Sequence, residues 1–176
     1  QVIGALRDRP LSVIRALRGQ KPFMQKNVPK YTPEWIPTTS VWSAASKRTI
    51  AYALCNDRRS LLWFANQRAV EFHPTLFRID EPDAPTHLVL DLDPPEGGDF
   101  RSVVAAAELV RQTLAEVGMS GAVKTSGSKG VHVFVPVTGA DTWDVALATR
   151  AVAVRAEALD PTVATTAFIK ADRDGK

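Results

Sequence analysis

Apolar and polar positions along the second half of the chain predict a mixture of strands and helices. Valines alternate with other residues over 130–137, which is the pattern of a strand with one buried face. Between 100 and 117, apolar residues recur every three or four positions, so we expect a helix that Asp99 caps and Gly118 ends. Further strands are expected at 88–93, 122–125 and 163–170, and a further helix from its cap at Asp141 to about Leu159.

The first half has weaker patterns and is interrupted by prolines. Pro29, Pro33 and Pro37 indicate that 27–40 is a loop, and Ser60 is a candidate N-cap for a short helix. The expected strands of this half are 11–14, 49–54 and 69–73. Because strands and helices do not alternate strictly, we expect an α/β fold of the α+β kind, with mixed, largely antiparallel sheets and flanking helices.

Composition narrows the class of protein. The chain has 176 residues, 45% of them hydrophobic and 23% charged, which suits one globular domain with its own core. No run of about 18 apolar residues occurs, so a membrane span is not expected. The single cysteine, Cys55, excludes a disulfide framework and fits a reducing cytosol. The chain opens at Gln1 within an apolar pattern and stops at Lys176 in a turn, so we expect a single domain, 1–176, trimmed at both ends.

The charge is mildly basic, with 22 Lys and Arg against 19 Asp and Glu and a net charge of +3. This balance permits a nucleic-acid partner without requiring one. Basic residues gather near the N-terminus, where Asp8 is the only acid, at Arg7, Arg9, Arg15, Arg18, Lys21, Lys26 and Lys30. Two interpretations stay open: a solvated basic face, or a groove that follows phosphates and stacks bases on aromatic residues such as Phe23.

Asp91 and Asp93 close an otherwise apolar strand. Residues two apart on a strand point to the same side, so these carboxylates should lie about 6–7 Å apart on one face. Their repulsion would be relieved by a divalent cation such as Mg²⁺ or Mn²⁺, which prefers hard oxygen ligands and substrate phosphates. The alternative is a pair of solvated aspartates at the end of a strand.

Residues 124–130 form a loop with two glycines and three hydroxyl side chains between two expected strands. Backbone N–H groups in such a loop can approach a phosphate closely, and Lys129 adds a positive charge. The spacing is not that of a Walker A loop. Ser126 and Lys129 also match the serine–lysine pair of penicillin-binding enzymes, but a strand follows here where that motif needs a helix. An ordinary polar hairpin loop is the other interpretation.

Six short motifs occur in a specific order along nearly the whole chain: Arg-Pro at 9–10, Phe-Met-Gln-Lys-Asn at 23–27, Trp-Phe-Ala-Asn-Gln at 63–67, Val-Glu-Phe-His at 70–73, Leu-Asp-Leu-Asp-Pro at 90–94 and Thr-Ser-Gly-Ser-Lys-Gly-Val-His at 125–132. In this order they resemble the polymerase domain of bacterial ATP-dependent DNA ligase D. They are also similar to the stand-alone actinobacterial primase-polymerases of the same archaeo-eukaryotic primase superfamily.

The resemblance implies template-dependent addition of NTPs or dNTPs to a primer 3′ end during end joining or short-gap filling. It implies that Asp91 and Asp93 are catalytic ligands of a two-metal site holding Mn²⁺ or Mg²⁺. Ser126 and Lys129 would contact the incoming triphosphate, and His73 would contact the nucleotide, at its sugar.

The same resemblance implies contacts to DNA and to larger partners. Phe23 would meet the templating base, Lys26 would bind DNA, and Arg173 would be a further basic residue near the nucleotide. The implied partners are primer–template, gapped or broken DNA, NTPs or dNTPs, the end-binding protein Ku and a DNA ligase. The implied location is the bacterial cytoplasm, in association with the nucleoid.

Two departures from the family pattern stand out. The family has a third catalytic aspartate, which by this match falls beyond Lys176, and neither Asp172 nor Asp174 takes its place. Ligase-linked members also carry a triphosphate-binding lysine in the strand after Arg-Pro, where this chain has Ile14 followed by Arg15.

Two other functions compete with the polymerase. In a haloacid-dehalogenase-type phosphatase, Asp91 would be the nucleophile and Asp93 a general acid, but Pro95 stands where that family has Thr or Val. A degenerate primase-like module that only binds nucleic acid would keep the basic N-terminal segment and would not need the two aspartates.

Overall fold

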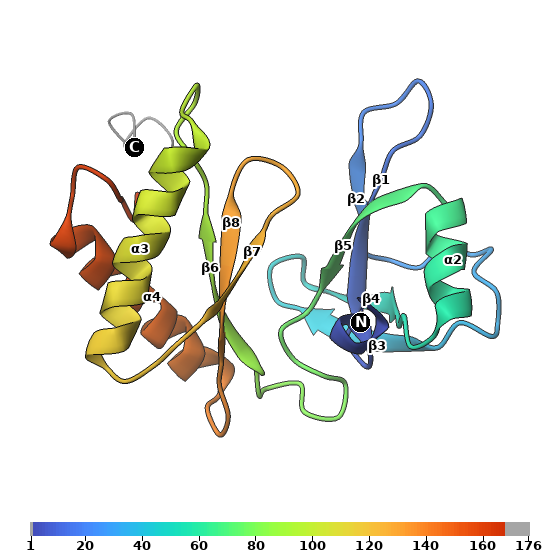
Figure 1. The fold of residues 1–176 in the computed structure, drawn as a ribbon. Coiled ribbons are helices and arrows are strands. Elements are labelled where there is room, and N and C mark those ends of the chain that lie inside the picture. Colours follow the sequence, from blue (N-terminus) through green and yellow to red (C-terminus); the bar gives the residue numbers. More distant parts are fainter. Residues whose placement is uncertain (1, 168–176) are drawn as a thin grey trace. The chain divides into compact units, whose positions relative to one another are not determined.

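The structure is a computed structural model and describes residues 2–167 (Figure 1). The chain divides into two compact units, residues 1–83 and 84–176. Each unit has its own sheet, and the pairings between the strands of each sheet are all antiparallel. Helices accompany both sheets. The prediction of a mixed α/β fold with largely antiparallel sheets is therefore confirmed.

The first unit is a five-stranded sheet with two helices. Its elements are α1 (Val2–Leu6), β1 (Leu11–Arg15), β2 (Phe23–Gln25), β3 (Thr38–Ser43), β4 (Arg48–Ala53), α2 (Arg58–Asn66) and β5 (Ala69–Pro74). Strand β1 pairs with β2, β4 and β5, and β3 pairs with β4. The first three residues of β1 are buried. Two of them, Leu11 and Val13, belong to one apolar core that contains Leu6, Leu11, Val13, Ile36, Ala53, Cys55 and Phe64.

Sequence reasoning missed two strands of this unit and misplaced one cap. Strand β2 was not expected, and β3 begins inside the range assigned to a loop, because its residues alternate between exposed and partly buried and none is fully buried. Asp57, not Ser60, caps α2: its carboxylate accepts a hydrogen bond from Ser60 N at 2.7 Å. The helix therefore starts about one turn earlier than expected, at Arg58.

The second unit is a three-stranded sheet in the order β6–β8–β7 with two long helices. Its elements are β6 (His87–Leu92), α3 (Phe100–Glu116), β7 (Ala122–Thr125), β8 (Val131–Pro136) and α4 (Thr142–Leu159). Figure 1 shows both helices on the same side of the sheet. The core between them is apolar and contains Leu88, Leu90, Val110, Leu114, Val133, Val135, Val145, Val152 and Ala156.

The helix boundaries of the second unit follow the predicted signals. Asp99 caps α3 and Asp141 caps α4 through backbone hydrogen bonds to their carboxylates. Gly118 follows α3 with φ +70°, and its N–H and that of Met119 bond back to the last turn, as in a Schellman motif. Of the strand expected at 163–170, residues 163–167 are not in a strand, and the rest lies outside the described residues. Within residues 2–167, no helix has the length and hydropathy of a membrane span.

Candidate active site

Asp91 and Asp93 lie at the end of β6, on the side of the sheet that the unit's helices leave uncovered. Leu88 and Leu90 are 1% and 5% exposed in the core, so the alternate residue Asp91 points to the opposite face, and its side chain is 63% exposed. The strand ends at Leu92, and Asp93 follows it. A Cβ atom placed on Gly130 would stand 2.8 Å from Asp93 Oδ1. Asp93 therefore lies against the start of β8.

The loop between β7 and β8 is a hairpin that Ser126 holds together. Ser126 N donates to Gly130 O at 2.9 Å. In return, Ser126 Oγ accepts hydrogen bonds from Ser128 N at 3.3 Å and Gly130 N at 3.1 Å. Gly127 has φ +89°, a left-handed conformation that a glycine adopts without strain. Two N–H groups expected to be free for a phosphate are therefore occupied, while the proton of the Ser126 hydroxyl can still be donated.

The loop and the two aspartates meet at one end of the sheet. Lys129 is exposed and immediately precedes Gly130, which lies against the main chain of Leu92 and the carboxylate of Asp93. The Ser126–Lys129 loop is thus a neighbour of the aspartate pair. The negative carboxylates and the positive Lys129 ammonium lie close together at this end of the sheet. Such a site suits an anionic ligand to which cations are bound.

A further residue, His132, joins this group and was not among the expected site residues. In the register of the sheet, His132 on β8 is the direct partner of Asp91 on one side and of Lys124 on the other. His132 Nε2 lies 3.2 Å from Asp91 Oδ1. The alternation of His132 with buried valines had placed it on the polar face, but its pairing with Asp91 depends on strand register, which the sequence does not fix.

His73 belongs to the first unit. It lies on β5 opposite Ser12 of β1, and its Nε2 is 3.0 Å from Glu71 Oε2. The side chains of His73 and Glu71 are 45% and 61% exposed. Ile14 pairs with Glu71 and so shares this face, where it contributes no charge. The imidazole is therefore accessible and has a carboxylate to orient it.

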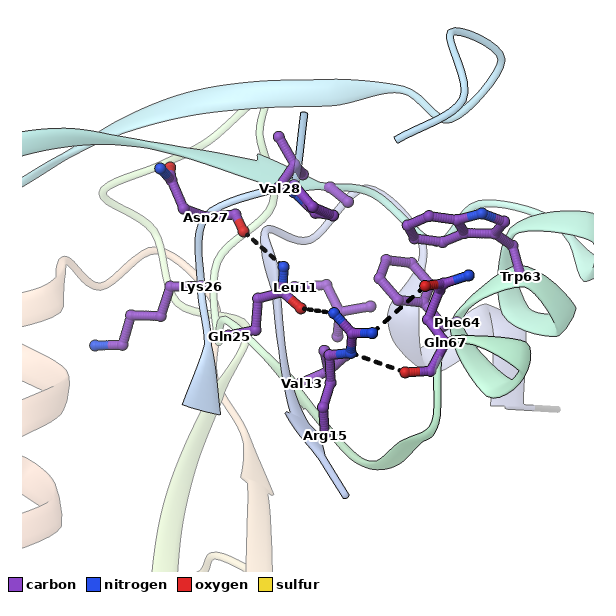
Figure 2. A pocket seen from close by; sticks show the side chains of 12 residues that line it. Leu11, Val13, Arg15, Gln25, Lys26, Asn27, Val28, Trp63, Phe64 and Gln67 are labelled. Atoms are coloured by element: carbon purple, nitrogen blue, oxygen red, sulfur yellow. Dashed lines mark hydrogen bonds between the residues drawn. The ribbon is translucent and has the colours of Figure 1, made fainter. Parts of the chain in front are cut away.

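Phe23 and Lys26 lie on and just after β2, beside a small pocket of the first unit. Phe23 is 39% exposed, and Figure 2 shows Lys26 pointing away from the pocket. Arg15 closes the pocket by donating to Gln25 Oε1 at 3.0 Å and to Gln67 O at 2.8 Å. The space inside, about 20 Å³ for a water-sized group, holds about one water molecule and no base.

The comparisons with known proteins decide the family. The family model described as "LigD, primase-polymerase domain" matches residues 1–176.

The chain belongs to the LigD primase-polymerase domain family.

Relatives carry the same domain within longer proteins. The bifunctional non-homologous end joining protein LigD of Bacillus subtilis is 34% identical over 135 residues, which are 76% of this chain and 21% of that protein. The multifunctional non-homologous end joining DNA repair protein LigD of Mycobacterium tuberculosis is 31% identical over 99% of this chain and 24% of that protein. The chain thus spans about a fifth to a quarter of the length of these LigD relatives.

A solved structure supports the same assignment. The polymerase domain of Mycobacterium tuberculosis ligase D in complex with DNA matches with a TM-score of 0.88 and 30% sequence identity. The match covers 99% of this chain and 64% of that chain. The LigD family assignment leaves the dehalogenase-type phosphatase unsupported.

The donor set at the end of β6 fits the hard divalent cation that a primase-polymerase domain implies. Asp91 and Asp93 offer carboxylate oxygens, the ligand type that Mg²⁺ and Mn²⁺ prefer. Both residues are exposed, so water and phosphate oxygens could complete the coordination. Among residues 2–167, no group of three or more His, Cys, Asp or Glu gathers as a metal site. Asp91 and Asp93 are thus candidate ligands for such a cation.

One expected site residue of the LigD domain, Arg173, lies outside the described residues. Asp172 and Asp174, which were not expected to be site residues, lie outside them as well. Arg9 of the Arg-Pro motif is described and is a structural residue: it is 8% exposed, and its Nη1 donates to the carbonyl oxygens of Thr75 and Leu76 at 3.1 and 2.7 Å. Burial, with a smaller effect of the positive charge of Arg78, lowers the pKa of the Arg9 guanidinium.

Proposed function

We propose that this chain is the catalytic domain of a metal-dependent, template-directed nucleotidyltransferase that adds NTPs or dNTPs to a primer 3′ end. One observation carries the proposal: Asp91 and Asp93 reach the open side of one sheet next to the Ser126–Lys129 loop. Membership in the LigD primase-polymerase family supports it. The family model spans both compact units, which supports the expectation that 1–176 belongs to one catalytic domain.

In this reaction the primer 3′ oxygen bonds to the α-phosphorus of the nucleotide, the bond to the bridging oxygen breaks and pyrophosphate leaves. Negative charge builds up on phosphate oxygens, so catalysis depends on positioning and on charge stabilisation. Divalent cations, Mn²⁺ or Mg²⁺, would supply most of that stabilisation when bound by Asp91 and Asp93. The protein's own task is to hold carboxylates and triphosphate at one end of the sheet.

Ser126 and Lys129 suit the triphosphate. The Ser126 oxygen is already the acceptor for two loop N–H groups, so its hydroxyl proton is directed to an outside acceptor such as a phosphate oxygen. Lys129 supplies an exposed ammonium beside the carboxylates. An ammonium–phosphate hydrogen bond is among the stronger kinds because both groups are charged.

Residues of the first unit are assigned to the sugar and the DNA. His73, oriented by Glu71, would contact the nucleotide sugar. The exposed ring of Phe23 suits stacking on the templating base, and the Lys26 ammonium suits a DNA phosphate. We include Arg173 as a further nucleotide contact on the basis of the family resemblance alone.

The setting of the reaction is proposed from the relatives. They are named for non-homologous end joining, and one solved relative is in complex with DNA. We therefore propose primer–template, gapped or broken DNA as substrate, Ku and a DNA ligase as partners, and the bacterial cytoplasm near the nucleoid as location.

A primer-extension assay with Mn²⁺ or Mg²⁺ tests the proposal, run beside a measurement of DNA affinity. Asp93→Asn should abolish extension and leave DNA binding intact. The matched control is Asp80→Asn, the same change at an exposed aspartate of the first unit, which should extend normally. If the unaltered protein, in a form that includes the family's third catalytic aspartate, binds DNA but extends no primer with either metal, it is the non-catalytic binding module instead.

A further inference from the structure

The guanidinium of Arg15 connects three segments of the first unit. Its Nη1 donates to Gln25 Oε1 at 3.0 Å and to the hydroxyl oxygen of Tyr31 at 2.8 Å. Its Nε donates at 2.8 Å to the carbonyl oxygen of Gln67, the C-cap of α2 (Figure 2). A guanidinium presents its donors in a rigid plane, so one side chain can hold several acceptors in a fixed arrangement. Arg15 therefore links β2 and the segment after it to the end of α2.

Strand β2 depends on such contacts because burial contributes little to its stability. Of its three residues, Phe23 and Met24 are exposed and Gln25 is only partly buried. Among the described strands, β2 pairs with β1 alone. A strand without a buried side chain gains little from the hydrophobic effect, so its hydrogen bonds determine how firmly it is held.

The Gln25 side chain extends the effect of Arg15 to Lys26. Its amide oxygen accepts from Arg15, and its amide nitrogen donates to Asn27 O at 3.2 Å. Asn27 is held in turn, because its Oδ1 accepts a hydrogen bond from Ala51 N of β4 at 2.8 Å. Both sequence neighbours of Lys26 are thus bonded to the rest of the unit, and Figure 2 shows Lys26 pointing away from the pocket.

Arg15 does not stand in for the triphosphate-binding lysine of ligase-linked family members. The family resemblance places that lysine at Ile14, which pairs with Glu71 on the face that carries His73. Successive residues of a strand point to opposite faces. Arg15 therefore lies on the other face of the sheet, where its hydrogen bonds to Gln25 and Gln67 are made.

We propose that Arg15 is a positioning residue for DNA: it fixes β2 and the segment after it so that Phe23 and Lys26 are presented to the template strand. This inference rests on the proposed function, because it assumes that these two residues contact DNA. In this role Arg15 touches neither a DNA phosphate nor the triphosphate of the nucleotide.

Three substitutions separate positioning from direct contact. Arg15→Lys keeps the positive charge but cannot bond to the same acceptors in the same geometry. Arg15→Met keeps an unbranched side chain and removes both the charge and the donors. Gln25→Leu breaks the link to β2 and leaves the arginine in place. An arginine that touched a phosphate would be replaced far better by lysine than by methionine, whereas a positioning arginine would be replaced poorly by both.

The test measures the affinity for primer–template DNA at several salt concentrations and the affinity for a nucleotide, with thermal unfolding as a check on folding. Although Arg15→Lys keeps its charge, it should lower the slope of log DNA affinity against log salt by about one, as Lys26→Ala should. Gln25→Leu should act in the same direction. Arg15→Lys combined with Lys26→Ala should lose little more than either change alone, because both remove the same contact. Nucleotide affinity should stay nearly unchanged.

The matched control is Arg101→Lys, the same change at an arginine of the second unit whose side chain is 95% exposed. It should bind DNA and nucleotide like the unaltered protein.

Other results would overturn the proposal in distinguishable ways. If Lys26→Ala leaves the salt slope unchanged, the assignment of β2 to DNA is itself wrong, and the positioning role is lost with it. If Lys26→Ala lowers the slope but folded Arg15→Lys and Gln25→Leu do not, the DNA assignment stands and the positioning role is wrong. If only Arg15→Met lowers the slope, Arg15 contacts a DNA phosphate directly. A loss of nucleotide affinity of about ten- to a hundredfold in the Arg15 variants would make Arg15 a triphosphate contact.

Discussion

The Asp93 carboxylate occupies the space into which a side chain at Gly130 would project. A Cβ atom on Gly130 would lie 2.8 Å from Asp93 Oδ1, and it would collide with the main-chain carbonyl of Leu92. Because that carbonyl belongs to the last residue of β6, it cannot swing aside as the tip of a side chain could. Because Gly130 has no side chain, the loop and the aspartate strand can approach each other this closely.

Replacing Gly130 with alanine should separate them. We expect Gly130→Ala to lower the free energy of unfolding by about 1–3 kcal/mol, the usual cost of overpacking, and to reduce primer extension by displacing Asp93. Urea unfolding and the extension assay measure the two effects. Gly4→Ala is the matched control, since a Cβ there meets no atom within 4 Å. A Gly130→Ala protein as stable and active as the original would refute the close approach.

Lys129 should affect nucleotide binding and not DNA binding. Losing one charge-assisted hydrogen bond to a phosphate costs about 1.5–3 kcal/mol, so Lys129→Ala should weaken nucleotide affinity by about ten- to a hundredfold. DNA affinity and its dependence on salt should stay nearly unchanged. Nucleotide titration and DNA binding at several salt concentrations measure the two.

Lys26→Ala provides the contrast, because Lys26 is assigned to a DNA phosphate. It should reduce the slope of log affinity for DNA against log salt by about one and leave nucleotide affinity intact. If Lys129→Ala changes the salt slope and Lys26→Ala does not, the Ser126–Lys129 loop has to be reassigned to DNA.

The cap of α2 makes stability depend on pH. The backbone N–H of Ser60 bonds to the Asp57 carboxylate and lowers its pKa below the ordinary value. A carboxyl with a lowered pKa stabilises the folded state above its ordinary pKa, and this contribution is lost as pH falls through the lowered value. Thermal unfolding should therefore show Asp57→Ala to be less stable at neutral pH, with a difference that shrinks in acid. A difference that grows as pH falls would contradict the cap.

Cys55 should be unreactive in the folded protein. Its side chain is fully buried, and burial, with a smaller effect of the Asp57 charge, raises the pKa of the thiol to about 11. Since the thiolate is the reactive form, a thiol reagent at pH 8 should label the protein only after denaturation. Cys55 is the single cysteine, so the signal is unambiguous. Rapid labelling of the native protein would show that the core of the first unit opens readily.

Sequence patterning predicted the second unit well because its signals are strong there. The alternating valines of β8 and the apolar run before Asp91 follow from one face of the sheet being buried. The end of α3 was found because Gly118 meets a steric need for positive φ. The first unit was predicted less well, since β3 is buried on neither face and Trp42 within it is 64% exposed.

The contacts between strands could not be predicted from the sequence. Asp91 and Asp93 could be assigned to one face from their spacing, but the pairing of Asp91 with His132 depends on a register that tertiary packing sets. The sequence-based choice of Ser60 as the cap of α2, where the structure has Asp57, was wrong for a similar reason. Both residues are good caps, and only the backbone geometry decides which one accepts the bond.

The central claim is that Asp91 and Asp93 act together in one metal-dependent site. The most direct measurement is the rate of incorporation of a single labelled nucleotide by Asp91→Asn, Asp93→Asn and the double variant, with Mn²⁺ present. Residues that act as a unit show losses that do not add, so either single change should abolish incorporation and the double change should cost little more. Near-normal incorporation by either single variant, or losses that multiply in the double variant, would contradict the shared site.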